Sequence, residues 1–466
     1  MTSQSPLATI GTSAMASHAP QSRAFLSAAA LAAAVPELSL RTEVPQLEIG
    51  AALPTAPSRG GETLIRLWGR PLGFVGLPIG AAPHRIAQLV STALAPAIQR
   101  ALREGGLPST GPLTVRGISG GPTLWQLERE RASRAGSPLA VVVCTRNRPE
   151  MLARALFSLS ALVFHDLEII LVDNDPTDPA AKAVFDAAVL RSVHPMRYVP
   201  ERRPGLSWAR NAGIAATDRE LIAFTDDDVV VDGNWAAEIV RVFDTCPTAG
   251  CVTGQILPFE FGSDASRWRE AYAGAQKYGF ERRVFDRDNG DGGDHGDVSK
   301  LFPFNTGECG SGVNMAFRRA ALDAIGGFDV ALGAGTPSRG GEDLAAFFDV
   351  LQAGSMLVYE PSALVSHAHR HTYDDLELQM RGWGSALTAY LTHIVLRRPS
   401  LLVPVLRRTR QGIATALLPS SGKNGRKPAD YPRSLTRAEL AAMASGPWRY
   451  LLGRARARRT LRIEAR

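Results

Sequence analysis

The sequence predicts an α/β fold with a mainly parallel central sheet. Between residues 138 and 226, short and almost wholly apolar runs alternate with stretches of helical periodicity. Strands this apolar are typical of a parallel sheet that helices cover on both faces. The predicted strands are 139–144, 167–174, 196–199 and 221–226, and the predicted helices begin at Pro149 and span 180–189 and 207–216.

Polar clusters follow three of these predicted strands. They are Thr145-Arg146-Asn147-Arg148, Asp173-Asn174-Asp175 and Asp226-Asp227-Asp228. Capping and turn formation explain Asn and Asp at such places in many α/β proteins. Because ligands of parallel sheets bind at the carboxyl ends of the strands, three clusters on one rim favour a nucleotide-diphosphate site.

The triple aspartate at the end of the run 221–226 indicates a metal site. Burying like charges together is costly unless a cation shares them. Hard divalent ions such as Mg²⁺ or Mn²⁺ take oxygen ligands and bridge carboxylates to the phosphates of a substrate. No glycine-rich phosphate loop follows the first predicted strand, so a metal and basic side chains are expected to neutralise the phosphates.

Six motifs in this order resemble family 2 glycosyltransferases of the GT-A fold. The resemblance covers residues 138 to 375, about half the chain, and its specificity lies in the ordered set rather than in any single motif. The motifs are Cys144-Thr145-Arg146-Asn147-Arg148, Val172-Asp173-Asn174, Gly205-Leu206-Ser207-x-Ala209-Arg210-Asn211-x-Gly213, Phe224-Thr225-Asp226-Asp227-Asp228, Gly326-Gly327-Phe328-Asp329 and Gly340-Gly341-Glu342-Asp343.

The resemblance implies a nucleotide-sugar donor, such as a UDP-sugar, and a Mn²⁺ or Mg²⁺ cofactor. It places Asp173 near the uracil or ribose. Asp226 and Asp228 match the ends of the Asp-x-Asp motif of the family, with Asp227 as a substitute because the triple Asp leaves the frame open. The implied nucleotide-binding residues are Thr145, Arg146, Asn147, Asp173, Asn174, Arg210, Asn211, Asp226 and Asp227.

The resemblance also implies a catalytic base and a third metal ligand. An acceptor hydroxyl needs a nearby carboxylate to take its proton, and the resemblance assigns this role to Asp343, with Glu342 as second choice. The alternative is that both acids only favour the start of a helix. His367 is the candidate that completes the metal shell, whereas we expect His369 and His371 to be solvated or to hold a phosphate.

The expected reaction is inverting transfer of a sugar to an acceptor hydroxyl, with the identity of the acceptor left open. One alternative is transfer to a polyprenyl phosphate or another lipid at the membrane surface. Another is a non-catalytic nucleotide-sugar-binding protein of the same fold. The segment 379–383 is similar to the Gln-x-x-Arg-Trp signature of processive synthases, but the spacing differs, so one sugar or a few are expected to be added.

The expected domain organisation has four parts. They are a disordered leader over 1–40, a small α+β domain over 41–137, the GT-A domain over 138–385 and a basic, mostly helical tail over 386–466.

Residues 397–466 hold seventeen Lys and Arg against three acidic residues, a local charge of +14 in a chain of net charge +7. Such a tail suits peripheral contact with an anionic membrane or a purely solvated role. It lacks the interleaved aromatic residues that base stacking requires, which argues against nucleic-acid binding.

Composition favours a cytoplasmic location, with peripheral contact at the inner face of the membrane. The four cysteines form neither a close-spaced framework nor a zinc-ligand pattern, which suits a reducing compartment. No apolar run reaches the roughly 20 residues that a spanning helix requires.

Overall fold

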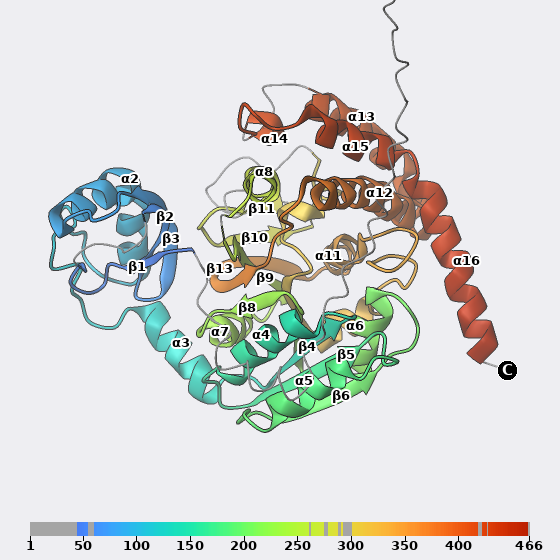
Figure 1. The fold of residues 1–466 in the computed structure, drawn as a ribbon, viewed down its shortest axis with the longest axis horizontal. Coiled ribbons are helices and arrows are strands. Elements are labelled where there is room, and N and C mark those ends of the chain that lie inside the picture. The colour runs from blue at the N-terminus through green and yellow to red at the C-terminus, as the bar shows by residue number, and fades with distance from the viewer. Residues whose placement is uncertain are drawn as a thin grey trace, which may run out of the picture.

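A computed structural model describes residues 44–54, 60–260, 262–274, 278–287, 290–291, 301–417, 422–425 and 427–464 (Figure 1). The expected leader over 1–40 lies outside these residues. At opposite ends of the molecule in Figure 1 are the N-terminal unit, in blue, and the C-terminal helix, in red.

The N-terminal unit is a three-stranded sheet with one long helix against it. Its elements are β1 (Gln46–Glu48), β2 (Gly61–Leu67), β3 (Arg70–Leu77) and α2 (Pro83–Glu104). Leu64, Ile65 and Leu67 of β2 are fully buried. A connecting helix, α3 (Leu124–Ala135), starts at a capping box between Thr123 and Gln126 and leads into the main domain.

A mixed ten-stranded sheet forms the centre of the main domain. Its order is β11-β10-β13-β9-β12-β7-β4-β5-β6, with β8 beside β13. Its strands are β4 (Leu139–Thr145), β5 (Leu167–Asp173), β6 (Met196–Pro200), β7 (Leu221–Asp226), β8 (Val229–Val231), β9 (Ala249–Pro258), β10 (Arg283–Asp286), β11 (Gly290–Asp291), β12 (Asn314–Arg318) and β13 (Met356–His367).

The four strands that the sequence predicts are parallel neighbours, whereas the added half of the sheet is mostly antiparallel. β4 pairs in parallel with β5 and β7, and β5 with β6. β12 then runs antiparallel between β7 and β9. The parallel half places Thr145, Asp173 and Asp226 at one edge, because β4, β5 and β7 end there in register.

Helices cover both faces of the sheet, as the apolar strands predict. Along β4, Val141 and Val143 face one core cluster, whereas Ala140 and Val142 face the other. The first face carries α4 (Pro149–Ser160), α5 (Ala180–Val189) and α7 (Trp235–Thr245), and the second carries α6 (Leu206–Ala215), α10 (Arg319–Ile325) and α11 (Glu342–Gln352). A further helix, α8 (Asp264–Ala273), and the short turn η1 (Thr306–Glu308) lie outside these two layers.

The C-terminal region is helical and packs on the main domain. The long helix α12 (Tyr373–Arg397) runs across the expected boundary between residues 385 and 386, so its first half and its second half belong to one element. It is followed by η2 (Pro399–Leu401), α13 (Leu402–Leu417), α14 (Gly422–Gly425), α15 (Arg433–Met443) and α16 (Gly446–Glu464). Within the described ranges, none of the helices combines the length and apolarity needed to span a bilayer.

Candidate active site

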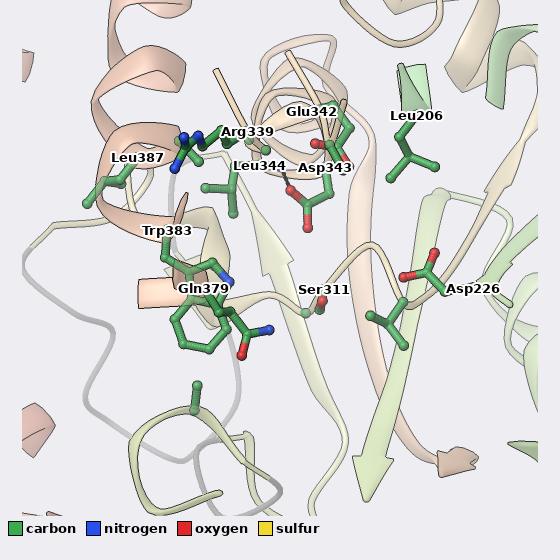
Figure 2. Close-up of a pocket in the computed structure, with 18 of the residues that line it drawn as sticks. Leu206, Asp226, Ser311, Arg339, Glu342, Asp343, Leu344, Gln379, Trp383 and Leu387 are labelled. Carbon is green, nitrogen blue, oxygen red and sulfur yellow. Dashed lines mark hydrogen bonds between the residues drawn. The ribbon is translucent and has the colours of Figure 1, made fainter. Parts of the chain in front are cut away.

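A cavity of about 1150 Å³ opens at the carboxyl edge of the sheet (Figure 2). Its walls come from the ends of β4, β7 and β13, the loop before β12, the start of α11, and the C-terminal helices α12, α13 and α15. Segments more than 250 residues apart in sequence therefore share one pocket, since Cys144 and Met443 both line it. In Figure 2, Asp226 lies across the open space from Asp343.

The middle residue of the triple aspartate is held by protein groups. Asp227 is buried, its Oδ2 accepts a 2.7 Å hydrogen bond from the Thr145 hydroxyl, and its Oδ1 lies 3.4 Å from Nη1 of Arg148. Burial and the neighbouring Asp228 raise the pKa of Asp227 to about 7. Because Asp227 is engaged by Thr145 and Arg148, Asp226 and Asp228 are the two carboxylates of this motif that could contact a bound ligand.

Asp228 lies between two basic groups. Arg148 donates to its Oδ2 at 3.0 Å, and Nε2 of His367 lies 3.2 Å from its Oδ1 without hydrogen-bond geometry, so that buried oxygen has no hydrogen-bond partner. Burial opposes ionisation of Asp228, but His367 and Arg148 outweigh it and lower its pKa to about 2. The structure thus places His367 beside Asp228, one of the two aspartates that the resemblance matches to the Asp-x-Asp motif.

These side chains fit a divalent cation that shares its shell with a substrate. Asp228 is an ionised carboxylate with an unsatisfied buried oxygen, and such an oxygen is a ligand that Mn²⁺ or Mg²⁺ accepts. Among the residues that the structure describes, no group of three or more His, Cys, Asp or Glu side chains is arranged to hold a metal by itself. The remaining ligands would therefore come from a diphosphate and water.

A buried arginine joins the metal motif to the expected base. Arg210, only 2% exposed, donates to Glu342 Oε1 at 2.8 Å and to the Gly312 carbonyl at 3.0 Å, and it lies 3.5 Å from Asp226 Oδ1. Burial raises the pKa of Asp226, and Arg210 opposes that effect. Arg210 therefore compensates two acidic groups from different motifs.

The two acids at the start of α11 have different surroundings. Glu342 is buried against Arg210, and its pKa rises to about 7 because of burial and the adjacent Asp343. Asp343 is half-buried at the cavity wall, and its Oδ2 accepts a 2.8 Å hydrogen bond from the Gly312 amide. A Cβ on Gly312 would lie 3.0 Å from Arg210 and 3.1 Å from Asp343, so a larger residue there would require these side chains to shift by a few tenths of an ångström.

The residues expected around the nucleoside divide into two groups. Thr145, Arg146 and Asn174 line the cavity. Asp173 is buried behind them, where it accepts a 2.6 Å hydrogen bond from the Tyr198 hydroxyl, and it does not line the cavity. Asn174 also holds the loop before α6, since its Oδ1 accepts from the Gly205 amide at 2.9 Å.

Asn147 and Asn211 also lie outside the cavity lining. Asn147 donates to Asp175 at 3.1 Å. Asn211 uses both amide atoms on the backbone of Phe328, at 2.8 and 2.9 Å. The motif containing Asn211 is thereby tied to the Gly326-Gly327-Phe328-Asp329 motif by a structural contact.

One histidine expectation is wrong. His369 is buried rather than solvated, and its Nε2 accepts from Arg269 at 2.6 Å and lies 3.2 Å from Glu270. Burial and Arg269 hold the pKa of His369 far below its ordinary value. His371 is 54% exposed, as expected.

Several cavity residues were not singled out from the sequence as site residues. Arg148 had a signal, because it belongs to the polar cluster after β4. Gln379 and Trp383 belong to the segment 379–383, whose similarity to the Gln-x-x-Arg-Trp signature did not assign them to the site. Arg339 had no signal, nor did the remaining cavity residues of α12 and α13, since only tertiary packing brings these segments to the cavity. They include Leu387, Leu391, Val405 and Arg408.

Residues 140–326 match the model of the family described as glycosyl transferase family 2. This part of the chain is therefore similar to family 2 glycosyltransferases. The matched region holds the triple aspartate and Arg210, and the mixed α/β sheet with its helical C-terminal region is the GT-A type of fold that the sequence predicts.

The relatives that this chain matches have diverse descriptions. The pre-mycofactocin glycosyltransferase of Mycobacterium tuberculosis is 25% identical over 58% of the chain and 50% of that protein. The succinoglycan biosynthesis protein ExoM of Rhizobium meliloti is 29% identical over 48% of the chain and 64% of that protein. The glucosyl-dolichyl phosphate glucuronosyltransferase of Haloferax volcanii is 23% identical over 49% of the chain and 68% of that protein.

The aligned part of the chain thus spans about half the length of the mycobacterial relative. Among solved structures, a mannosyltransferase from Pyrobaculum calidifontis in complex with GDP-Man and Mn²⁺ is similar, with a TM-score of 0.39 and 16% identity, over 71% of this chain and 80% of that one.

Proposed function

We propose that the protein transfers a sugar from a nucleotide-diphosphate donor, such as a UDP-sugar, to an acceptor hydroxyl with inversion and with the help of Mn²⁺ or Mg²⁺. The observation that carries this proposal is the shared cavity: Asp226 and Asp228 form one wall, Asp343 another, and Arg210 connects them. A glycosyltransferase needs its leaving-group site and its base on either side of one reacting carbon.

The donor would lie along the edge of the sheet. Thr145, Arg146 and Asn174 line the part of the cavity at the ends of β4 and β5, where a nucleoside would fit. Asp226, Asp228 and His367 would hold the metal, which when bound supplies positive charge for the departing diphosphate. Arg148 is 40% exposed and adds a second positive group beside Asp228.

Asp343 would act on the acceptor. As the acceptor oxygen forms its bond to the anomeric carbon, the bond to the diphosphate oxygen breaks and the hydroxyl proton passes to the Asp343 carboxylate. The Gly312 amide fixes one oxygen of this carboxylate. Glu342 is the weaker candidate, because its carboxylate is paired with Arg210 inside the protein. A single displacement of this kind inverts the anomeric configuration.

The change Asp343→Asn tests the assignment of the base. We expect turnover to fall by roughly 10²–10⁴-fold, because general-base catalysis contributes about that much. Binding of UDP with Mn²⁺, measured by calorimetry, should stay near the wild-type value, since the amide keeps an acceptor for the Gly312 amide. Full activity of this variant would place the base elsewhere, and absence of turnover in the wild type with a panel of donors would favour a non-catalytic role.

We also propose that the C-terminal helices contact an anionic membrane surface from the side on which α13 lies. Leu402, Val403 and Leu406 of α13 are 45%, 72% and 56% exposed, and Arg407 and Arg410 follow them on the same helix. Exposed apolar side chains interleaved with arginine are typical of helices that lie in a lipid interface.

A further inference from the structure

A stripe of α12 side chains lines the cavity beyond the proposed base. Gln379, Trp383, Leu387 and Leu391 are spaced four residues apart, so they lie on one face of the helix. The twelve steps along the helix from Gln379 to Leu391 correspond to a length of about 18 Å. Figure 2 shows Trp383 and Leu387 on the same side of the open space as Leu344, which follows Asp343 directly.

The last two positions of the stripe, Leu387 and Leu391, are apolar. Leu344, Leu387 and Leu391 are only partly buried although they border a core cluster that contains Tyr390 and Val405. Their remaining surface faces the cavity. The lining also includes Leu301 and, from α13, Val405, Arg408 and Gly412. We call this part of the cavity, lined by Leu301, Leu344, Leu387, Leu391 and Val405, the apolar branch.

A nucleotide sugar offers nothing that matches the apolar branch. Its phosphates, sugar and ribose are polar, and the charged half of the cavity at Asp226, Asp228 and Arg148 suits them. Leaving leucine side chains against water is unfavourable, whereas covering them with an alkyl chain is favourable. The apolar branch also starts beside Asp343, where the acceptor hydroxyl would be activated.

The far end of the branch adjoins the exposed face of α13. Val405 and Arg408 point to the cavity, whereas Leu402, Val403 and Leu406 of the same helix are exposed. An apolar chain that follows the branch to this helix would thus reach further apolar side chains flanked by Arg407 and Arg410. This continuity suits a chain that comes from a lipid phase with anionic groups.

We propose that the apolar branch is the acceptor subsite and that the acceptor is amphipathic, with its reacting hydroxyl at Asp343 and a long apolar chain along α12 toward α13. This inference rests on the proposed function, because it takes Asp343 as the base. It specifies the substrate class, which the family assignment of residues 140–326 leaves open, since α12 and α13 lie outside the matched region.

Binding of n-alkyl β-D-glucosides to the full-length protein tests this proposal. Methyl, butyl, octyl and dodecyl members are titrated by calorimetry below their critical micelle concentrations, with UDP and Mn²⁺ present. We expect affinity to rise with chain length, by at most roughly fourfold for each methylene buried. Equal affinities across the series, or no binding of the dodecyl member, would overturn the proposal.

Variants locate the binding in the apolar branch. Leu387→Asn should remove most of the dependence on chain length. Leu391→Trp stays apolar but narrows the far end, so it should abolish the gain from octyl to dodecyl while butyl binding persists. Leu451→Asn is the matched control, because this leucine is 45% exposed on α16 and does not line the cavity. A chain-length dependence that both cavity variants retain would place the chain elsewhere.

Metal-dependent hydrolysis of nucleotide sugars by the wild type, measured without acceptor, separates this proposal from the proposed function. Hydrolysis without any chain-length dependence of glucoside binding would overturn only the acceptor subsite. Chain-length-dependent binding in a protein that turns over no donor, with or without acceptor, would instead contradict the glycosyltransferase mechanism.

Discussion

The three consecutive aspartates have different roles because each side chain leaves the chain in a different direction. Asp226 closes β7, where Arg210 lies 3.5 Å away. Asp227 turns inward to Thr145, and Asp228 faces Arg148 and His367. The sequence left open which aspartate contacts the metal, and the burial of Asp227 favours the outer two.

Exchanging single aspartates tests this division. Asp228→Asn should weaken Mn²⁺ binding, because it removes a direct ligand, and the loss should be at least the roughly 10–100-fold that removal of an outer-shell partner costs. Asp227→Asn should retain most of the Mn²⁺ affinity, since its hydrogen bond with Thr145 can persist. Titration of Mn²⁺ followed by electron paramagnetic resonance measures both, and a larger loss in the Asp227 variant would reverse the assignment.

Arg210 is the residue whose removal should be most damaging to both folding and turnover. Arg210→Met leaves Glu342 and Asp226 without their buried counter-charge, and breaking a buried ion pair in this way costs about 3–5 kcal/mol of unfolding free energy. Arg210→Lys keeps the charge but loses the forked guanidinium that reaches Glu342 and Gly312 together. This variant should therefore be more stable than Arg210→Met, but it should turn over more slowly than the wild type.

Urea unfolding and turnover of the two Arg210 variants are compared with Arg458→Met, an exposed position on α16. The control should match the wild type in both measurements. If Arg210→Met is as stable as the wild type, Glu342 and Asp226 must take up protons in the variant and need no neighbouring cation.

At the scale of elements, the α/β alternation could be predicted because β4, β5 and β7 are buried on both faces, whereas the edge strand β6 is only partly buried. The predicted strand 139–144 is β4 (Leu139–Thr145), and the predicted helix 180–189 is α5. Of the residues that end these strands, Thr145 and Asp226 line the cavity, whereas Asp173 does not. β13 was not predicted, because Pro361 lies inside it and proline normally argues against a central strand.

Tertiary packing decided the remaining part of the site. The pairing of β13 with β9 shifts register between Glu360 and Val365, and this irregularity accommodates the proline. The apolar stripe of α12 could not be assigned from its sequence, because the same periodicity serves a buried helix or a cavity wall. Asn211 shows the converse: the resemblance assigns it to the nucleotide, yet its side chain forms hydrogen bonds with the Phe328 backbone.

A buried histidine fixes α12 to the main domain and gives this attachment a pH dependence. Nδ1 of His393 lies 2.7 Å from Asp329, and Nε2 lies 3.4 Å from Asp349, which also pairs with Arg397 and Arg398. The hydroxyl of Tyr450 from α16 donates to Asp329 at 2.7 Å. Burial lowers the pKa of His393, but the two aspartates outweigh it and raise the pKa above 6.5.

Stability should therefore fall as His393 loses its proton. Since the folded-state pKa is raised, the contribution is complete below the unfolded pKa of about 6.5 and disappears as pH rises through the higher folded value. His393→Gln should be less stable than the wild type at acidic pH and should lose less stability than the wild type on going to alkaline pH. Urea unfolding of both proteins on either side of this window measures the effect, and parallel pH profiles would contradict it.

At the scale of the whole molecule, the chain joins three parts around one sheet. The N-terminal unit is attached through the ion pair Arg66–Asp232, at 2.6 Å, and the connecting helix α3 is attached through Arg129–Glu238, at 3.4 Å. The C-terminal helices cover the other end and complete the cavity. The basic charge lies on the same helices that carry exposed apolar side chains, so a membrane would meet the molecule beside the apolar branch and away from the N-terminal unit.

Sedimentation with lipid vesicles tests this orientation. The wild type should bind vesicles that contain phosphatidylglycerol more strongly than pure phosphatidylcholine, because each arginine near an anionic surface contributes about 1 kcal/mol. The triple change of Leu402, Val403 and Leu406 to Ser should weaken binding to both, since these side chains would insert into the interface. Ile79→Ser, at a site 76% exposed on the N-terminal unit, is the control and should bind like the wild type. If salt abolishes vesicle binding equally in the wild type and the triple variant, the binding is due to charge attraction alone and α13 does not insert into the membrane.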